Sequence, residues 1–150
     1  MSEEEMFSSN HKQITGDFAE HLTMYWLSKK GIECTHVRHT GIDIIASFGS
    51  VRWGISVKAR SRKDWQENYG FTINKPYEHI QKVKKACFHF GCKEYFAFIL
   101  DQKSEVTCYL ITLDTVLKHY NPSEKLKSQE WNLKKFIEEK GVSKFNLSWI

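Results

Sequence analysis

The stretch that decides the fold is TGIDIIASFGSVRWGISVKARSR, residues 40–62. Two apolar-rich runs flank Gly49 and Ser50. A glycine at the first central position of a two-residue loop is typical of a type II′ turn between two antiparallel strands. We therefore predict a β-hairpin in which Phe48 pairs with Val51.

The predicted register gives the hairpin one apolar and one polar face. Counting back from the turn places Asp43 opposite Ser56 and Gly41 opposite Lys58. Because side chains alternate along a strand, Ser56, Lys58 and Arg60 share the face of Asp43. An acid with two bases on one face can hold a divalent cation on Asp43 and keep an ammonium beside it. The competing interpretation is a weak ion pair between an Asp at a strand start and a Lys on a solvent-facing edge.

The composition is that of one globular domain. The chain has 150 residues, 41% of them hydrophobic, which is enough to build a single core. No apolar run approaches the roughly 20 residues that a membrane span needs, and the acidic start is unlike a secretion signal. We expect a cytoplasmic protein with no membrane partner. The net charge of +4 permits nucleic-acid binding without requiring it. The four cysteines are scattered, so a zinc site is a poor fit.

The hydrophobic periodicities predict a single α/β domain with a mixed sheet. Helices are expected at 14–30, 77–90, 112–120 and 131–140. Strands are expected at 33–39, in the hairpin, at 71–73, 94–101 and 106–112, and in a terminal segment with Phe145, Leu147 and Trp149. Residues 1–12 are expected to form a flexible N-terminal tail ahead of one domain, 13–150.

Two further groups of charged residues accompany the hairpin. Glu20 is the one carboxylate on the less exposed second face of the first predicted helix; it either joins the hairpin or is simply solvated. A set of basic residues follows the hairpin in sequence, namely Lys58, Arg60, Arg62, Lys63, Lys75, His79 and Lys82. If these converge, they form a phosphate-binding surface beside Asp43. The other interpretation is an ordinary solvated helix face.

The order of elements and charged residues resembles the PD-(D/E)XK nuclease superfamily, most of all the archaeal Holliday-junction resolvases and the Mrr-type restriction endonucleases. Three segments carry the resemblance: Gly16–Glu20, Gly41–Ala46 and Ile55–Lys58. It implies a restriction-endonuclease-like mixed β-sheet flanked by helices. The resemblance covers about 14–101, which divides the domain into a nuclease-like core, 13–101, and an unmatched C-terminal extension, 102–150.

The resemblance also implies roles for individual residues. Glu20 and Asp43 would hold Mg²⁺ or Mn²⁺, and Lys58 would assist the attacking water. Position 56, an acid in the family, is the fourth catalytic position and is Ser56 here. Backbone contacts to duplex or branched DNA are expected from Arg60, Arg62, Lys63 and Lys82. A homodimer is implied, because cutting both strands needs two active sites.

The serine at position 56 leaves three alternatives open. Ser56 binds the cation weakly through water, or Glu67 or Glu78 supplies the missing carboxylate, or the fold has lost catalysis and keeps a nucleic-acid surface. The first two describe a metal-dependent DNA endonuclease. The third describes an inactive nuclease-fold module that binds DNA or a protein. A domain that interacts only with proteins is a further hypothesis, since the net charge is modest.

Overall fold

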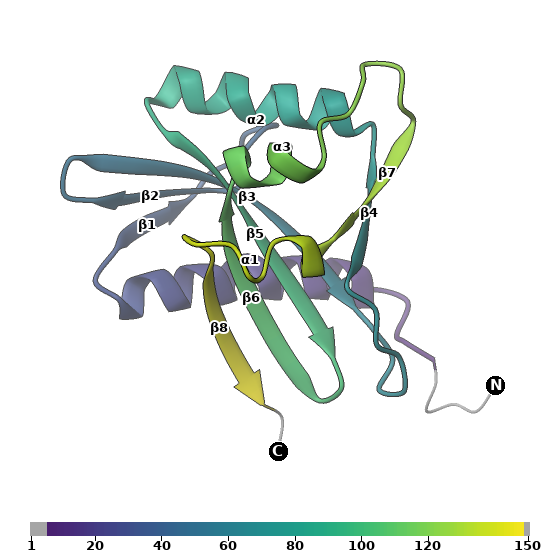
Figure 1. Ribbon diagram of the computed structural model, residues 1–150. Coiled ribbons are helices and arrows are strands. Elements are labelled where there is room, and N and C mark those ends of the chain that lie inside the picture. Colours follow the sequence, from purple (N-terminus) through teal and green to yellow (C-terminus); the bar gives the residue numbers. More distant parts are fainter. Residues whose placement is uncertain (1–5, 149–150) are drawn as a thin grey trace.

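The computed structural model describes residues 6–148, which form a mixed sheet with helices on both faces (Figure 1). The elements are α1 (His11–Lys29), β1 (Glu33–His36), β2 (Ile44–Phe48), β3 (Val51–Ser61), β4 (Gly70–Asn74), α2 (Pro76–Phe90), β5 (Lys93–Gln102), β6 (Glu105–Thr112), α3 (Leu113–His119), β7 (Ser128–Asn132) and β8 (Ser143–Ser148). Six strands form the main sheet in the order β1-β2-β3-β5-β6-β8. The β3–β5 pair is parallel, and β4 pairs with β7 in a separate antiparallel ribbon. The predicted α/β fold with a mixed sheet is confirmed.

The hairpin register is confirmed over five pairs, from Phe48 opposite Val51 to Ile44 opposite Ile55. Gly49 has φ +63°, as the predicted turn requires. The prediction is wrong one residue further on, where Asp43 was placed opposite Ser56. The Asp43 N–H donates instead to the carbonyl of Ile55 at 2.8 Å. Asp43 and Ile44 therefore both lie opposite Ile55, which is the arrangement of a β-bulge.

Gly41 is also not opposite Lys58, because the chain before the bulge turns toward α2. A Cβ added to Gly41 would lie 2.1 Å from the carbonyl oxygen of Lys82 and 2.9 Å from the Ala86 Cβ. The glycine thus allows the chain to approach the backbone of α2 more closely than any other residue would permit. This contact fixes the segment that carries Asp43 into the sheet.

Two hydrophobic clusters fill the two sides of the main sheet. On one side, Leu22, Trp26 and Leu27 of α1 pack against a layer that includes Ile44 and Ile55. On the other side, α2 and α3 cover a cluster that the β4–β7 ribbon completes; its largest members are Phe71, Phe96, Phe98, Trp131 and Phe136. Residues of β3 alternate between the two sides, so one side of this strand is free to carry polar groups toward α2.

The predicted helix at 131–140 is wrong. Trp131 is fully buried in β7 opposite Phe71 of β4, and a single turn of 3₁₀ helix, Leu133–Lys135, follows it. Burial of this indole in the ribbon outweighs the helical spacing of the segment. The first helix begins at His11, so it includes the end of the predicted tail; residues 1–5 and Trp149 lie outside the described residues. Between residues 6 and 148, no helix is long and apolar enough to cross a membrane.

We expect Gly41→Ala to destabilise the protein by about 1–3 kcal/mol or more, because the new methyl group overlaps a backbone carbonyl that cannot move aside. Urea unfolding monitored by circular dichroism measures the change. Gly16→Ala is the control, since a Cβ there meets nothing within 4 Å and α1 should gain about 0.5–1 kcal/mol. Equal stability of the two variants would contradict the proposed close approach.

Candidate functional site

The site forms where β3 extends beyond its neighbour β2. The β2–β3 ladder ends at Ile55, whereas β3 pairs with β5 as far as Ser61 and Asp101. Within the described chain, residues 56–61 therefore have no strand partner on the β2 side. This open edge of β3 faces a groove between α1 and β4.

Asp43 closes the end of the ladder with its side chain. Its carboxylate Oδ2 accepts the Val57 N–H at 2.7 Å. Burial raises the pKa of Asp43, and the nearby carboxylate of Glu20 adds to the rise; the Val57 hydrogen bond, Lys58 and His36 oppose it. Asp43 is therefore a partly desolvated acid held at a fixed position on the open edge.

Lys58, on the open edge of β3, is close enough to Asp43 for their charges to interact. Burial lowers the pKa of Lys58 to about 8; Asp43 opposes this shift and Arg60 adds to it. A lysine with a pKa near neutrality can exchange a proton under physiological conditions, which an exposed lysine cannot do. The desolvated acid and the perturbed amine are the kind of pair that marks a functional site.

Glu20 reaches the same region from α1. Its carboxylate is hydrogen-bonded to the Nε2 of His36 at the end of β1, and the Glu20 side chain is 24% exposed. The His21 ring lies edge-on to the His36 ring at 5.6 Å. Glu20, Lys58 and His36 are all close enough to Asp43 for their charges to affect its pKa. His36 was not predicted from the sequence, because its contact with α1 is long-range.

Ser56 lies two residues before Lys58 on the same face of β3, the face that α2 covers. Its side chain is buried, and its Oγ is 3.5 Å from the Nε2 of His79. Burial lowers the pKa of His79 to about 4, with contributions from the positive charges of Lys58 and Lys82. His79 is therefore neutral at physiological pH and does not belong to the predicted basic surface. A neutral Ser–His pair occupies the place where the family pattern has an acid.

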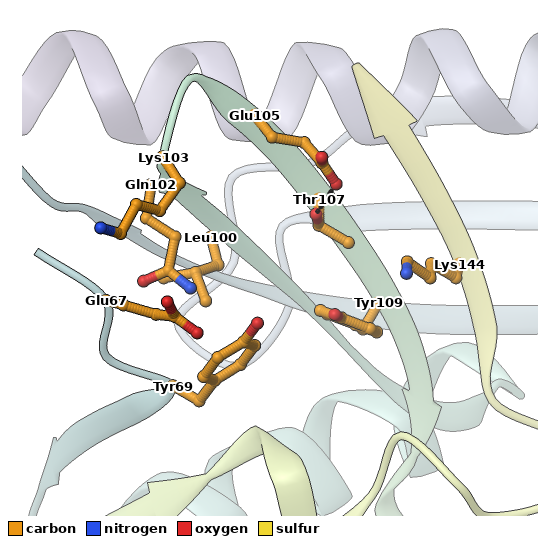
Figure 2. Close-up of a pocket in the computed structure, with 9 residues that line it drawn as sticks. All are labelled: Glu67, Tyr69, Leu100, Gln102, Lys103, Glu105, Thr107, Tyr109 and Lys144. Carbon is orange, nitrogen blue, oxygen red and sulfur yellow. Dashed lines mark hydrogen bonds between the residues drawn. The ribbon is translucent and has the colours of Figure 1, made fainter. Parts of the chain in front are cut away.

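The two other carboxylates considered for the missing acid lie elsewhere. Glu67 lines a separate cavity of about 220 Å³ beside Tyr69 and Gln102 (Figure 2), and that cavity shares no lining residue with the groove along β3. Glu78 pairs with Lys82 at 3.2 Å on the surface of α2. Neither carboxylate is among the groups that perturb the pKa of Asp43. In this structure neither Glu67 nor Glu78 takes the place of the missing acid.

Two of the predicted DNA contacts have structural partners. Arg60 donates to the carbonyl oxygen of Thr72 at 2.7 Å and stacks over the Phe71 ring, and Arg62 donates to the carbonyl oxygens of Asn68 and Gly70. Both arginines therefore fasten β4 to β3.

Lys63 and Lys82 lie apart from each other. The Lys63 Nζ is 5.8 Å from the centre of the Phe7 ring, whereas Lys82 lies on α2 in its ion pair with Glu78. Arg60 lines the groove. The predicted basic residues thus surround the open edge of β3 without forming one continuous patch.

The residues at the site offer a cation two carboxylates. Among the described residues, no three His, Cys, Asp or Glu side chains gather into a complete metal site. Asp43 and Glu20 each use one oxygen in a hydrogen bond to a protein group. Mg²⁺ is commonly bound by one or two carboxylates together with waters and substrate phosphates. The donor set therefore fits an open cation site that a phosphate and water complete.

Comparison with solved structures decides the fold. A Holliday junction resolvase from Archaeoglobus fulgidus, Hjc, superimposes with a TM-score of 0.59 at 16% sequence identity, over 81% of this chain and 86% of that chain. The fold is that of a Holliday junction resolvase. No protein-family model matches the sequence, and no curated protein matches it significantly. The restriction-endonuclease-like fold that the sequence predicted is confirmed, and at this identity the likeness concerns the fold alone.

The His79 environment predicts a pH dependence of stability. The pKa of His79 is about 4 in the folded protein and about 6.5 in the unfolded chain, so between these values the unfolded chain binds the extra proton. Stability from this residue is complete above about pH 6.5 and falls as the pH drops toward 4. At about pH 5 the loss should be on the order of 1–2 kcal/mol.

Urea unfolding at about pH 7.5 and about pH 5 measures this loss. His79→Gln should abolish it, because glutamine stays neutral at both values. His89→Gln, at an exposed position on the same helix, should leave it unchanged. The same pH-dependent loss in wild type and His79→Gln would contradict the assignment of a partly buried, neutral imidazole.

Proposed function

We propose that this protein is a metal-dependent DNA endonuclease of the PD-(D/E)XK type, similar in activity to a resolvase. The observation that carries the proposal is that Asp43, just before β2, interacts with the charges of Glu20 on α1 and Lys58 on β3, where β3 extends beyond its partner β2. The fold shared with a Holliday junction resolvase supports it. The reaction class is hydrolysis of a phosphodiester.

Each residue has a distinct part in the proposed reaction. Asp43 and Glu20 would hold Mg²⁺ or Mn²⁺, which supplies Lewis acidity and lowers the pKa of a bound water. Lys58, with its pKa of about 8, positions the attacking water and stabilises negative charge on the phosphoryl oxygens. Ser56 is the neutral neighbour on the same face as Lys58, and it contacts His79.

The proposed substrate is DNA, bound along the open edge of β3. Arg60 and Arg62 hold β4 in place at one side of the groove, and their positive charge attracts the phosphate backbone. Lys63 and Lys82 extend that attraction along the exit of β3 and along α2. We propose a homodimer as the state that cuts both strands, since each chain supplies one such site.

The second candidate function is a DNA-binding module without catalysis. The serine at position 56 and the two-carboxylate donor set favour it, because a site with one charged ligand fewer stabilises the transition state less. The two functions share the groove and differ in whether a divalent cation binds at Asp43.

The first test is calorimetric titration of Mn²⁺ into the wild-type protein and Asp43→Ala, with and without DNA that cannot be cleaved. We expect weak binding to the protein alone and tighter binding with DNA, because phosphate oxygens complete the site. The Asp43→Ala variant should lose cation binding and cleavage while keeping most of its DNA affinity. Asp17→Ala is the control, since Asp17 is an exposed carboxylate on α1. Cleavage retained by Asp43→Ala would overturn the endonuclease, and no cation binding in either condition would favour the inactive module.

The second test restores the acid at position 56. We expect Ser56→Glu to tighten Mn²⁺ binding on the order of tenfold, because a third charged oxygen joins the donor set. Ser56→Gln is the matched control, with the same size and no charge, and should leave Mn²⁺ affinity unchanged. Because position 56 is buried, circular dichroism must first show that both variants are folded. Equal affinities in the two folded variants would place position 56 outside the cation site.

A further inference from the structure

The groove along β3 lies next to the proposed reaction centre and shares Lys58 with it. It has a volume of about 720 Å³, and its floor is the open edge of β3 from Val57 to Ser61. Lys58 lies at one end of this floor. At the other end, the Ser61 Oγ is 2.9 Å from the Nε2 of His11, whose ring is 4.3 Å from that of Phe7. The groove therefore connects Lys58 to a pair of aromatic rings at the start of α1.

The groove lining is suited to a polyanion. Among the described residues that line it there is no Asp or Glu, whereas Lys12, Lys58 and Arg60 are positively charged. Hydroxyl groups make up much of the remainder, from Ser8, Ser9, Thr15, Ser61 and Thr72. One wall is also open at the backbone, because a Cβ on Gly16 would meet nothing within 4 Å. A phosphate chain can thus approach α1 closely at Gly16.

The aromatic end adds a feature that phosphate binding alone does not need. The Phe7 side chain is 45% exposed, although it lies in the groove lining beside His11. The Lys63 Nζ lies 5.8 Å from the centre of the Phe7 ring. Proteins that bind single strands combine a basic groove with aromatic rings on which bases stack. In a duplex, the bases are already stacked and paired, and the backbone alone faces such a groove.

We infer that this groove binds a single, unpaired DNA strand, with a base stacked at Phe7 and a phosphate at Lys58. The inference rests on the proposed DNA-processing function and specifies its substrate class as DNA with an unpaired segment. The volume of the groove is in the range of ligand pockets, which suits one strand. From Ser61 to Lys58 the strand floor measures about 10 Å at 3.3 Å per residue.

The test compares a fluorescent single strand with the same sequence as a duplex, by anisotropy titration at fixed salt. We expect the single strand to bind more tightly. Phe7→Ala should weaken single-strand binding by at least about fivefold and leave duplex binding nearly unchanged, because one stacking contact is lost. Phe88→Ala is the matched control, since Phe88 is 82% exposed on α2 and does not line the groove. A strand carrying 2-aminopurine should lose fluorescence on binding to the wild type but not to Phe7→Ala.

A second pair of variants tests the path along α1. Gly16→Glu places a carboxylate in the groove and should weaken single-strand binding more than Gln13→Glu, which adds the same charge at an exposed position outside the groove lining. Duplex affinity equal to single-strand affinity, or equal effects of Phe7→Ala and Phe88→Ala, would overturn the inference. Cation titration of the wild type and Asp43→Ala separates this inference from the proposed function. If single-strand binding persists while neither protein binds a cation, the single-strand groove is supported and the nuclease activity is contradicted.

Discussion

The hydrogen bond from the Val57 N–H to the Asp43 carboxylate organises the site. A strand edge whose partner ends must satisfy its backbone groups in another way, and here a side chain takes over where the β2 backbone turns away. The bulge at Asp43 places the carboxylate in that position, and the contact of Gly41 with α2 holds the preceding segment. The hydrogen bond between Val57 and Asp43 marks the end of the β2–β3 ladder, beyond which the edge of β3 is open. It also holds the Asp43 carboxylate in place. A regular hairpin would have continued the ladder and closed the groove.

Asp43 and Lys58 affect each other's pKa, but burial has the larger effect on both. For Asp43, desolvation exceeds the stabilising effects of the Val57 N–H and of Lys58, so its pKa rises; for Lys58, desolvation exceeds the attraction of Asp43, so its pKa falls to about 8. Two opposite charges in water would instead have stabilised each other's charged forms. The region is therefore desolvated enough to disfavour both charges, although Lys58 also lines the groove.

Local pattern was sufficient to predict the hairpin, its turn and the α/β fold, because a glycine-containing two-residue turn and alternating side chains fix a register without outside information. The choice of Glu20, Asp43 and Lys58 as site residues came from the hairpin pattern and the family resemblance and stays a prediction. Prediction failed where distant contacts decide the structure. The segment after Trp131 has helical spacing, but burial of the indole against β4 determines its structure. The bulge at Asp43 depends on the contact of the preceding segment with α2. The partners His36 and His79 come from elements that are far from the hairpin in sequence.

The serine at position 56 changes the charge of the site as well as its ligand count. With Glu20 and Asp43 ionised and Lys58 protonated, the three groups carry one net negative charge, where a third acid would have made it two. A divalent cation is then attracted less strongly, and an approaching phosphate is repelled less. The neutral Ser56–His79 pair keeps this balance, since the pKa of His79, about 4, prevents it from adding a positive charge. Such a site favours a cation and a phosphate that arrive together, each supplying the charge that the other lacks.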